Sequence, residues 1–388
     1  MKSRSIKGGS LEEIRIALDQ FSSFDNQSFT PRLAIVFVSI KQDWKAISEL
    51  LYLHGIDVIG ATTAGEFIDG HQSSGEIAML LLDIPKDAYS IIFEEIGDRE
   101  MQTVASHLTN TALSIFKKPG IILCSTSFNQ KGEFLGGDVL MESMTKEVGS
   151  RVSIYGGMAG DDITFSGSFV FTNKHSTDHG MVALVLDEDK IEMKGVAISG
   201  WKPMGISRTI TKSEGNLLYT IDDRPALEMY LQYLGEDIKS AEDQVLFFNS
   251  VGVHYPFQIE RDNRTPKICN PIGYDVEEQA LICESEVPQG SKFWFSTPPD
   301  FDIIDTIVDS AREIKKNTSG KADALLIFSC AGRLNAMGPL AQEENEQLAE
   351  VWEAPMAGFY TYGEYGKTIN GDNEFHSTTC SWVVLKEK

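Results

Sequence analysis

The segment "ALLIFSCAGR" (324–333) combines an apolar run typical of a buried strand with three residues that can do chemistry. Ser329 and Cys330 end the run, and Arg333 follows. A guanidinium group can hold a carboxylate through two parallel hydrogen bonds, and open α/β sheets bind ligands at the carboxyl ends of their strands. We therefore expect Ser329, Cys330 and Arg333 to bind a small ligand. The alternative is that Arg333 pairs with a structural carboxylate between two domains.

Three glycine turns that end in an acidic residue are the second group of candidates. They occur in "VIGATTAGEF" (58–67), "IYGGMAGDD" (154–162) and "MAGFYTYGEYG" (356–366). Glycine lets a ligand or a backbone approach closely and permits positive φ. An amino acid held by Arg333 would need an acid for its ammonium group, and the candidates are Glu364, Asp161 and Asp162. We expect the strand ends and the turns to enclose one cleft, unless the glycines only allow helix and sheet to pack tightly.

Cys330 is also a possible nucleophile, for which His376 is the obvious base. The opposing interpretation is that Cys330 is a packing residue, because cysteine is among the most buried residue types and this one follows an apolar strand. The sequence contains no GxSxG, HExxH or CxxC motif. It therefore predicts a protein that is not an enzyme, with a thiol-dependent enzyme using Cys330 as an alternative.

One histidine has the surroundings that a haem ligand needs. Haem iron is bound by a neutral imidazole in an apolar setting, and His254 lies in the apolar segment "SVGVHYPFQI". A histidine among aromatic residues is more often a packing residue. The five cysteines include no CxxC pair, which favours reduced thiols and argues against structural zinc. We expect no cofactor, with haem bound by His254 as the alternative.

Charge and composition exclude two classes of partner. The formal net charge of −23 would repel a nucleic acid backbone, and no basic stripe compensates for it. No segment approaches the roughly 18 consecutive apolar residues of a membrane span. The first 21 residues carry basic groups but lack the apolar core of a secretory signal. We therefore expect a cytoplasmic protein with no nucleic acid and no membrane partner.

The elements that must position the candidate residues form a repeating pattern. Apolar strands at 33–40, 120–127 and 324–332 each follow an amphipathic helix. After each strand come a second helix, a second strand, a glycine turn and a closing apolar strand. Such repetition predicts units of helix, strand, helix, strand, glycine turn and strand. A strand–helix–strand connection gives parallel pairing, and a turn gives antiparallel pairing. The expected class is α/β, with mixed parallel and antiparallel sheets covered by helices.

The spacing of the units predicts two domains. Two units fall within residues 1–222, whereas the third follows a strand-rich segment in residues 223–388. The boundary lies just before the helix "PALEMYLQYLG" (225–235), which begins at a proline and ends at a glycine. A chain of 388 residues is also longer than one ordinary hydrophobic core supports.

Several motifs, taken in order, resemble those of the FIST family. They are "GIDVIGATTAGEF", "YGGMAGDD", "GWKPMG", "IDDRPALEMYLQYLG", "FSCAGR" and "GFYTYGEYG". The resemblance covers nearly the whole chain from about residue 30 and implies a FIST N-terminal domain followed by a FIST_C domain. It also implies an intracellular sensory module that binds a small ligand, with amino acids as the proposed ligands. Some members are reported as haem-binding nitric oxide sensors that regulate a histidine kinase.

The resemblance and the residues together predict a sensory protein of signal transduction. No kinase, cyclase or receiver segment is visible, so we expect the output to pass through a separate signalling partner such as a histidine kinase. The expected ligand is an amino acid or a similar small polar metabolite. The alternatives are a haem-binding nitric oxide sensor and the thiol-dependent enzyme.

Overall fold

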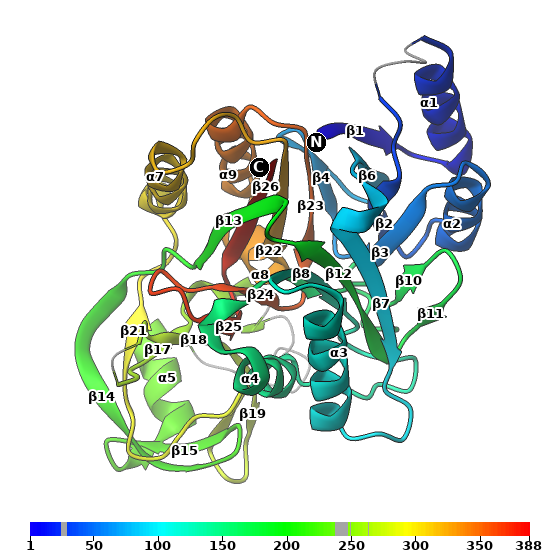
Figure 1. Cartoon of the computed structure of the whole chain (residues 1–388). Helices are drawn as coiled ribbons and strands as arrows, with labels where there is room; N and C mark the ends of the chain where they lie inside the picture. The colour runs from blue at the N-terminus through cyan, green and yellow to red at the C-terminus, as the bar shows by residue number, and fades with distance from the viewer. Residues whose placement is uncertain (25–28, 237–246, 249, 263) are drawn as a thin grey trace.

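The computed structural model describes residues 1–24, 29–236, 247–248, 250–262 and 264–388. This part of the chain contains eight α-helices and 26 β-strands, and the strands form four sheets. Three sheets of six strands make up a large lobe, and one sheet of eight strands makes up a small lobe at the lower left of Figure 1. The predicted mixed α/β class is confirmed.

The first sheet shows how the large lobe is built. Its central strand β2 (Leu33–Ser39) is parallel to β3 (Asp57–Thr63) and antiparallel to β6 (Ile77–Asp83). β1 (Lys2–Gly8) pairs with the other edge of β6. Every residue of β2 is buried, which explains its continuous apolar run, because a sheet covered on both faces has no polar side.

The second and third sheets arrange strands in the same order around their central strand. Their strands are β7 (Tyr89–Glu95), β8 (Pro119–Ser125), β9 (Ser153–Met158) and β12 (Gly180–Asp187) in the second sheet, and β13 (Ile191–Ile198), β22 (Ala324–Cys330), β23 (Met356–Thr361) and β26 (Cys380–Glu387) in the third. β8 is parallel to β9 and antiparallel to β12, which also pairs with β7. β22 is parallel to β23 and antiparallel to β26, which also pairs with β13.

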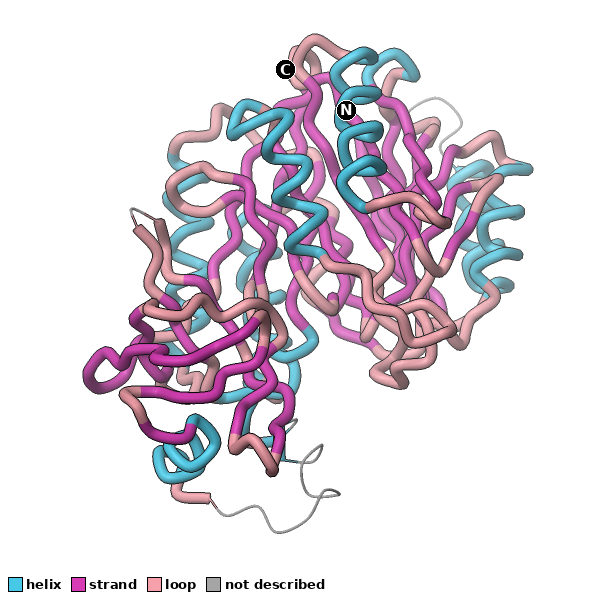
Figure 2. Tube along the Cα trace, turned by 90° about the horizontal axis from the view of Figure 1, so that it is seen from below, coloured by secondary structure: helices cyan, strands magenta, loops and turns pink. Residues whose placement is uncertain are grey.

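Helices cover the outer faces of these sheets (Figures 1 and 2). They are α1 (Leu11–Phe24) and α2 (Trp44–Leu53) on the first sheet, α3 (Met101–Ile115) and α4 (Gly137–Val148) on the second, and α7 (Phe301–Lys316) and α9 (Leu340–Trp352) on the third. The short α8 (Ala331–Met337) follows β22 directly. Local signals start two of them: Asp43 caps α2 and Asp300 caps α7 by accepting hydrogen bonds from backbone N–H groups. No helix in the described ranges is both long and apolar enough to cross a membrane.

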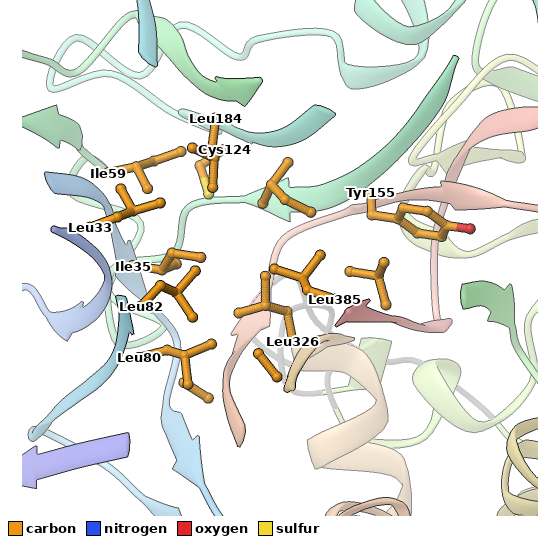
Figure 3. Packing of buried hydrophobic residues seen from close by; sticks show 14 of the residues in the cluster. Leu33, Ile35, Ile59, Leu80, Leu82, Cys124, Tyr155, Leu184, Leu326 and Leu385 are labelled. Atoms are coloured by element: carbon orange, nitrogen blue, oxygen red, sulfur yellow. The ribbon is translucent and has the colours of Figure 1, made fainter. Parts of the chain in front are cut away.

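The inner faces of the three sheets meet in one apolar core. Figure 3 shows side chains from all three sheets in this cluster, including Leu33, Ile35, Leu80 and Leu82 from the first, Cys124 and Leu184 from the second, and Leu326 and Leu385 from the third. Each of these side chains is fully buried. Burying one leucine contributes about 1.5–3 kcal/mol, so this core fixes the three sheets relative to one another.

After β3, β9 and β23 the chain forms a hairpin on a different sheet before it returns to its own. The hairpin strands are β4 (Glu66–Ile68) and β5 (His71–Ser73), β10 (Val170–Thr172) and β11 (Ser176–Thr177), and β24 (Glu364–Lys367) and β25 (Asn373–His376). β4 pairs with β23, β10 pairs with β3, and β24 pairs with β9. The first sheet therefore receives a hairpin from the second, the second from the third, and the third from the first.

These hairpins explain why glycine occurs in the turn motifs. Gly60 lies opposite Phe171 and Gly358 lies opposite Phe67 in the strand registers. A Cβ atom on Gly60 would lie 2.2 Å from the Phe171 ring, and one on Gly358 would lie 2.1 Å from the Phe67 ring. The interpretation that these glycines permit tight packing is correct for this pair of positions, although the partner is an aromatic ring from another unit and not a helix.

The structure does not confirm the order of elements that was predicted for the repeat unit. A hairpin lies between each glycine turn and the closing strand of its unit. In each sheet a further strand, β1, β7 or β13, pairs with the outer edge of the closing strand. The hairpin strands are only two to four residues long. Strands of this length are at or below the minimum of about four residues over which an alternating apolar pattern can be recognised.

The small lobe consists of one sheet with α5 (Ala226–Leu234) packed against it. Its strands are β14 (Pro203–Glu214), β15 (Leu217–Ile221), β16 (Arg224–Pro225), β17 (Phe257–Ile259), β18 (Lys267–Cys269), β19 (Pro271–Asp275), β20 (Ala280–Cys283) and β21 (Lys292–Ser296). The domain boundary after residue 222 stays a prediction. Both lobes contain strands from either side of it, since β13 pairs with β26 and β14 pairs with β21.

Candidate functional site

The three glycine turns contact one another and form what we call the turn junction, made of residues 63–66, 158–162 and 361–364. Backbone hydrogen bonds connect them: Asp162 N–H donates to the Thr63 carbonyl over 2.8 Å, and Met158 N–H donates to the Gly363 carbonyl over 2.8 Å. Ala64 N–H of the first turn donates to the carbonyl of Tyr360, which lies in β23 just before the third turn, over 3.0 Å. The turns therefore converge, and they do so by bonding to each other.

Two acids of the turn junction are buried and hydrogen bonded on both carboxylate oxygens. Glu364 accepts from the Thr361 hydroxyl and from Thr379 N–H, and Glu66 accepts from Thr63 and from Glu76 N–H. Burial raises the pKa of Glu66 to about 7, and burial raises the pKa of Glu364 well above its usual value. Each carboxyl therefore accepts one hydrogen bond from the threonine three residues before it and one from a backbone N–H group outside the junction.

The two aspartates of the second turn reach the other sheets. Asp161 accepts from the Tyr362 hydroxyl over 2.6 Å. Burial alone would raise the pKa of Asp161, but the hydrogen bonds from Tyr362 and nearby backbone N–H groups hold it below its usual value. Asp162 accepts from the Ser39 hydroxyl over 2.7 Å and pairs with Lys41 over 3.0 Å. Its second oxygen, Oδ1, is buried and has no hydrogen bond in the described part of the chain.

Arg333 is completely buried and forms an ion pair with Glu344 of α9. It also donates to the carbonyl oxygens of Ser199 and Thr378, and its guanidinium carbon lies 5.3 Å from the centre of the Trp201 ring. Burial lowers the pKa of Arg333, but the nearby Glu344 carboxylate outweighs this effect and raises it. The guanidinium therefore stays charged. The structure thus has the pairing with a structural carboxylate that the sequence left open as the alternative.

Ser329 and Cys330 are buried at the end of β22. The Ser329 carbonyl accepts from the Thr361 hydroxyl over 3.3 Å. Burial, reinforced by the negative charges of Glu364 and Glu284, raises the pKa of the Cys330 thiol well above its usual value. A nucleophilic cysteine needs the opposite shift, so this environment disfavours the thiol-dependent alternative.

The largest cavity described between the lobes is a cleft of about 620 Å³, which we call the interlobe cleft. One wall comes from the small lobe and includes Gln258, Arg261 and Ile268, and the facing wall includes Ile198 and Trp201. α7 and β25 line the remaining sides. None of the six residues predicted to bind the ligand belongs to this lining: Ser329, Cys330, Arg333, Glu364, Asp161 and Asp162.

The predicted residues of the third repeat unit instead support the wall of the cleft. Arg333 holds the carbonyl of Ser199, and Glu364 accepts from Thr379 N–H over 3.1 Å. Cys330 N–H donates to the Thr379 carbonyl over 3.0 Å. Ser199 and Thr379 both line the interlobe cleft. The contribution of the predicted residues to ligand binding stays a prediction, and the structure places three of them one layer behind the cleft surface.

Glu374 and His376 of β25 are two polar residues of the cleft lining that the sequence analysis did not assign to a ligand site. The Glu374 side chain is 9% exposed, and its Oε2 accepts from Arg261 over 2.6 Å. Its Oε1 is buried and lacks a hydrogen bond in the described residues. Desolvation lowers the pKa of His376 to about 4, so the imidazole is neutral at pH 7. Both residues line the cleft, together with Phe375 between them.

Family models of the FIST N domain and the FIST C domain match residues 32–224 and 226–367. The chain belongs to the FIST family. FIST domains are sensory domains of signal transduction, a class that senses small ligands. A relative in Methanocaldococcus jannaschii, described as the uncharacterized protein MJ1623, is 23% identical over 375 residues. The match covers 85% of this chain and 68% of that protein.

Both regions of this FIST protein combine the two family domains. The turn junction joins Thr63 and Met158 of the FIST N domain to Gly363 of the FIST C domain. The interlobe cleft joins Trp201 of the former to Arg261 of the latter. Glu374 lies beyond the matched ranges, so the family motifs did not draw attention to it. The alternation of Glu374 and His376 in "NEFH" (373–376) was the one available signal.

His254, the predicted haem ligand, lies in a single 3₁₀ turn of the small lobe. Its backbone carbonyl accepts from the Trp201 indole N–H over 3.1 Å, and its side chain is not part of the cleft lining. The largest described cavity therefore does not fit a haem held by His254. No group of three or more potential metal ligands occurs among the residues for which the structure gives positions.

Proposed function

We propose that this FIST protein is a sensory protein inside the cell that binds an amino acid or a similar small polar metabolite in the interlobe cleft. Family membership supports the sensory role. The observation that carries the choice of site is a guanidinium and a carboxylate that line the same cleft, with one carboxylate oxygen that has no hydrogen bond among the described residues. Arg261 and Glu374 offer opposite charges to the two ends of a zwitterion.

The output is proposed to pass to a separate signalling partner, such as a histidine kinase. A ligand between two lobes has a direct route to such an effect, because it contacts both lobes and favours the arrangement that it binds best. Copurification of a kinase with the tagged protein, changed by the added ligand, is the measurement for this part of the proposal.

Thermal-shift screening of the amino acids tests the binding step. A ligand at 100 times its dissociation constant adds about 2.7 kcal/mol to the free energy of unfolding. Arg261→Met should reduce the shift, because Arg261 holds the Glu374 carboxylate in place, whereas Arg224→Met, the same change elsewhere in the small lobe, should keep it. Absence of any shift with the amino acids or with related small metabolites would contradict the proposal.

A haem-binding sensor is the second candidate, because a neutral imidazole lines the interlobe cleft. That imidazole belongs to His376, whose Nε2 lies 3.2 Å from the Gly366 carbonyl, and not to His254. Reconstitution with haem followed by an absorption spectrum tests this candidate. A Soret band that is lost in His376→Ala and kept in His254→Ala would support it, and a colourless protein would exclude it.

A further inference from the structure

Glu374 Oε1 is a buried polar atom at the interlobe cleft that has no hydrogen-bond partner among the described residues. Most buried polar atoms in proteins have a hydrogen-bond partner, and leaving one without a partner costs about 1–3 kcal/mol. Oε2 of the same carboxylate is satisfied by Arg261. The Arg264 guanidinium is 3.8 Å from Oε1, which is beyond hydrogen-bond distance. Oε1 is therefore the oxygen of this carboxylate that has no hydrogen-bond donor among the described residues.

The charges around the cleft indicate what this donor is. Three cationic side chains line it, and so do three anionic ones: Lys202, Arg261 and Lys267, and Asp309, Glu313 and Glu374. A ligand with one positive and one negative group preserves this balance. An ionised carboxylate only accepts hydrogen bonds, and it binds most strongly to a charged donor. The group that suits Oε1 is therefore an ammonium.

Apolar side chains from both walls also line the cleft. Ile198 and Ile268 are half-buried, and Trp201 is 6% exposed. Trp201 is held in place on two sides, by its hydrogen bond to the His254 carbonyl and by the Arg333 guanidinium against its ring. A rigid apolar wall gains binding energy only from a ligand that covers it with apolar surface.

We infer that the interlobe cleft selects amino acids with a large apolar side chain, with the ligand's ammonium group on Glu374 Oε1 and its side chain against Ile198, Trp201 and Ile268. This inference rests on the proposed function and names the ligand class within it. Glycine would leave the apolar wall uncovered, and a second carboxylate, as in aspartate, would be desolvated against it. The ammonium contact is expected to matter more than the ligand's carboxylate, because the Arg261 guanidinium already has Glu374 as a partner.

Calorimetric titration of the full-length protein with four matched probes tests the inference. L-phenylalanine and 2-phenylethylamine carry the ammonium group and the ring, whereas 3-phenylpropionate lacks the ammonium group and N-acetyl-L-phenylalanine has a neutral amide in its place. We expect the first two to bind at least tenfold more tightly than the last two. Equal binding of 3-phenylpropionate and phenylalanine would overturn the inference.

Two variants make the assignment specific. Glu374→Gln keeps the shape of the side chain and should weaken phenylalanine binding at least tenfold, while Glu228→Gln, at an exposed position of α5 outside the cleft lining, should not. Ile268→Ala should weaken phenylalanine more than alanine. Near-UV circular dichroism verifies that each variant is folded. Unchanged affinity in a folded Glu374→Gln protein would contradict the inference.

The outcomes also separate the inference from the proposed function. If glycine or aspartate binds in the screen and phenylalanine does not, the sensory proposal stands and the ligand class is wrong. If none of the amino acids and related metabolites binds, the proposed function and the inference both fail.

Discussion

The turn junction and the interlobe cleft both gather charged side chains from distant parts of the chain, but they treat them differently. In the junction, Glu66 and Glu364 receive hydrogen bonds on both oxygens, from a threonine of their own turn and from a backbone N–H group. In the cleft, one carboxylate oxygen of Glu374 has no hydrogen-bond donor among the described residues. Asp162 Oδ1 of the junction also lacks a hydrogen bond among the described residues, but of the two acids only Glu374 lines the interlobe cleft. The conspicuous glycine and acid motifs therefore mark where units interlock, whereas the less conspicuous β25 presents an acceptor in the cleft.

The largest expected effect comes from breaking the parallel strand pair that leads into the junction. A Cβ atom on Gly156 would lie 1.8 Å from the Leu123 carbonyl oxygen, and φ is +148°. We expect Gly156→Ala to lower the free energy of unfolding by at least about 4 kcal/mol, among the largest effects of single substitutions. Gly149→Ala, with φ of +61° and open space around it, should cost about 1–2 kcal/mol. Urea unfolding measures both, and similar midpoints would contradict the close packing.

Arg333 provides the second test, because it separates structural support from ligand binding. Arg333→Met leaves Glu344 buried without its partner and should cost about 3–5 kcal/mol. Arg333→Met combined with Glu344→Leu should recover most of this loss, because both buried charges are then gone. The amino acid shift should persist in the double variant. Loss of binding in a stable double variant would instead show that Arg333 acts in the ligand site.

The third test uses the pH dependence of the turn junction. Since burial raises the pKa of Glu66 to about 7 from its usual 4.5, the folded protein binds more protons than the unfolded chain between these values. Stability is therefore greatest below pH 4.5 for this group and declines through pH 7, by roughly 3 kcal/mol in total. Glu66→Gln should remove this decline. Unfolding at pH 5 and 8 measures it, with the exposed Glu49→Gln as the control, and parallel pH profiles would contradict the assignment.

Sequence reasoning located the central strands and the family, because continuous apolar runs and ordered motifs are local signals. It could not foresee that Phe171 lies over Gly60 or that Glu344 pairs with Arg333, since these partners come from other elements. The acids Asp161 and Asp162 were expected in a ligand site because they follow a strand end. The structure places them against Tyr362 and against Ser39, and it builds the cleft from two lobes, whose docking no local pattern encodes.

The circular exchange of hairpins has a consequence for biosynthesis. The third sheet contains β4, which is synthesised early, and β23, which is synthesised late. The pairing of Phe67 with Gly358 therefore cannot form until translation is nearly complete. Pairing between such remote segments is slow to form. The nascent first half therefore emerges from the ribosome with an unsatisfied strand edge, and we expect its maturation to depend on chaperones that shield this edge until the last residues arrive.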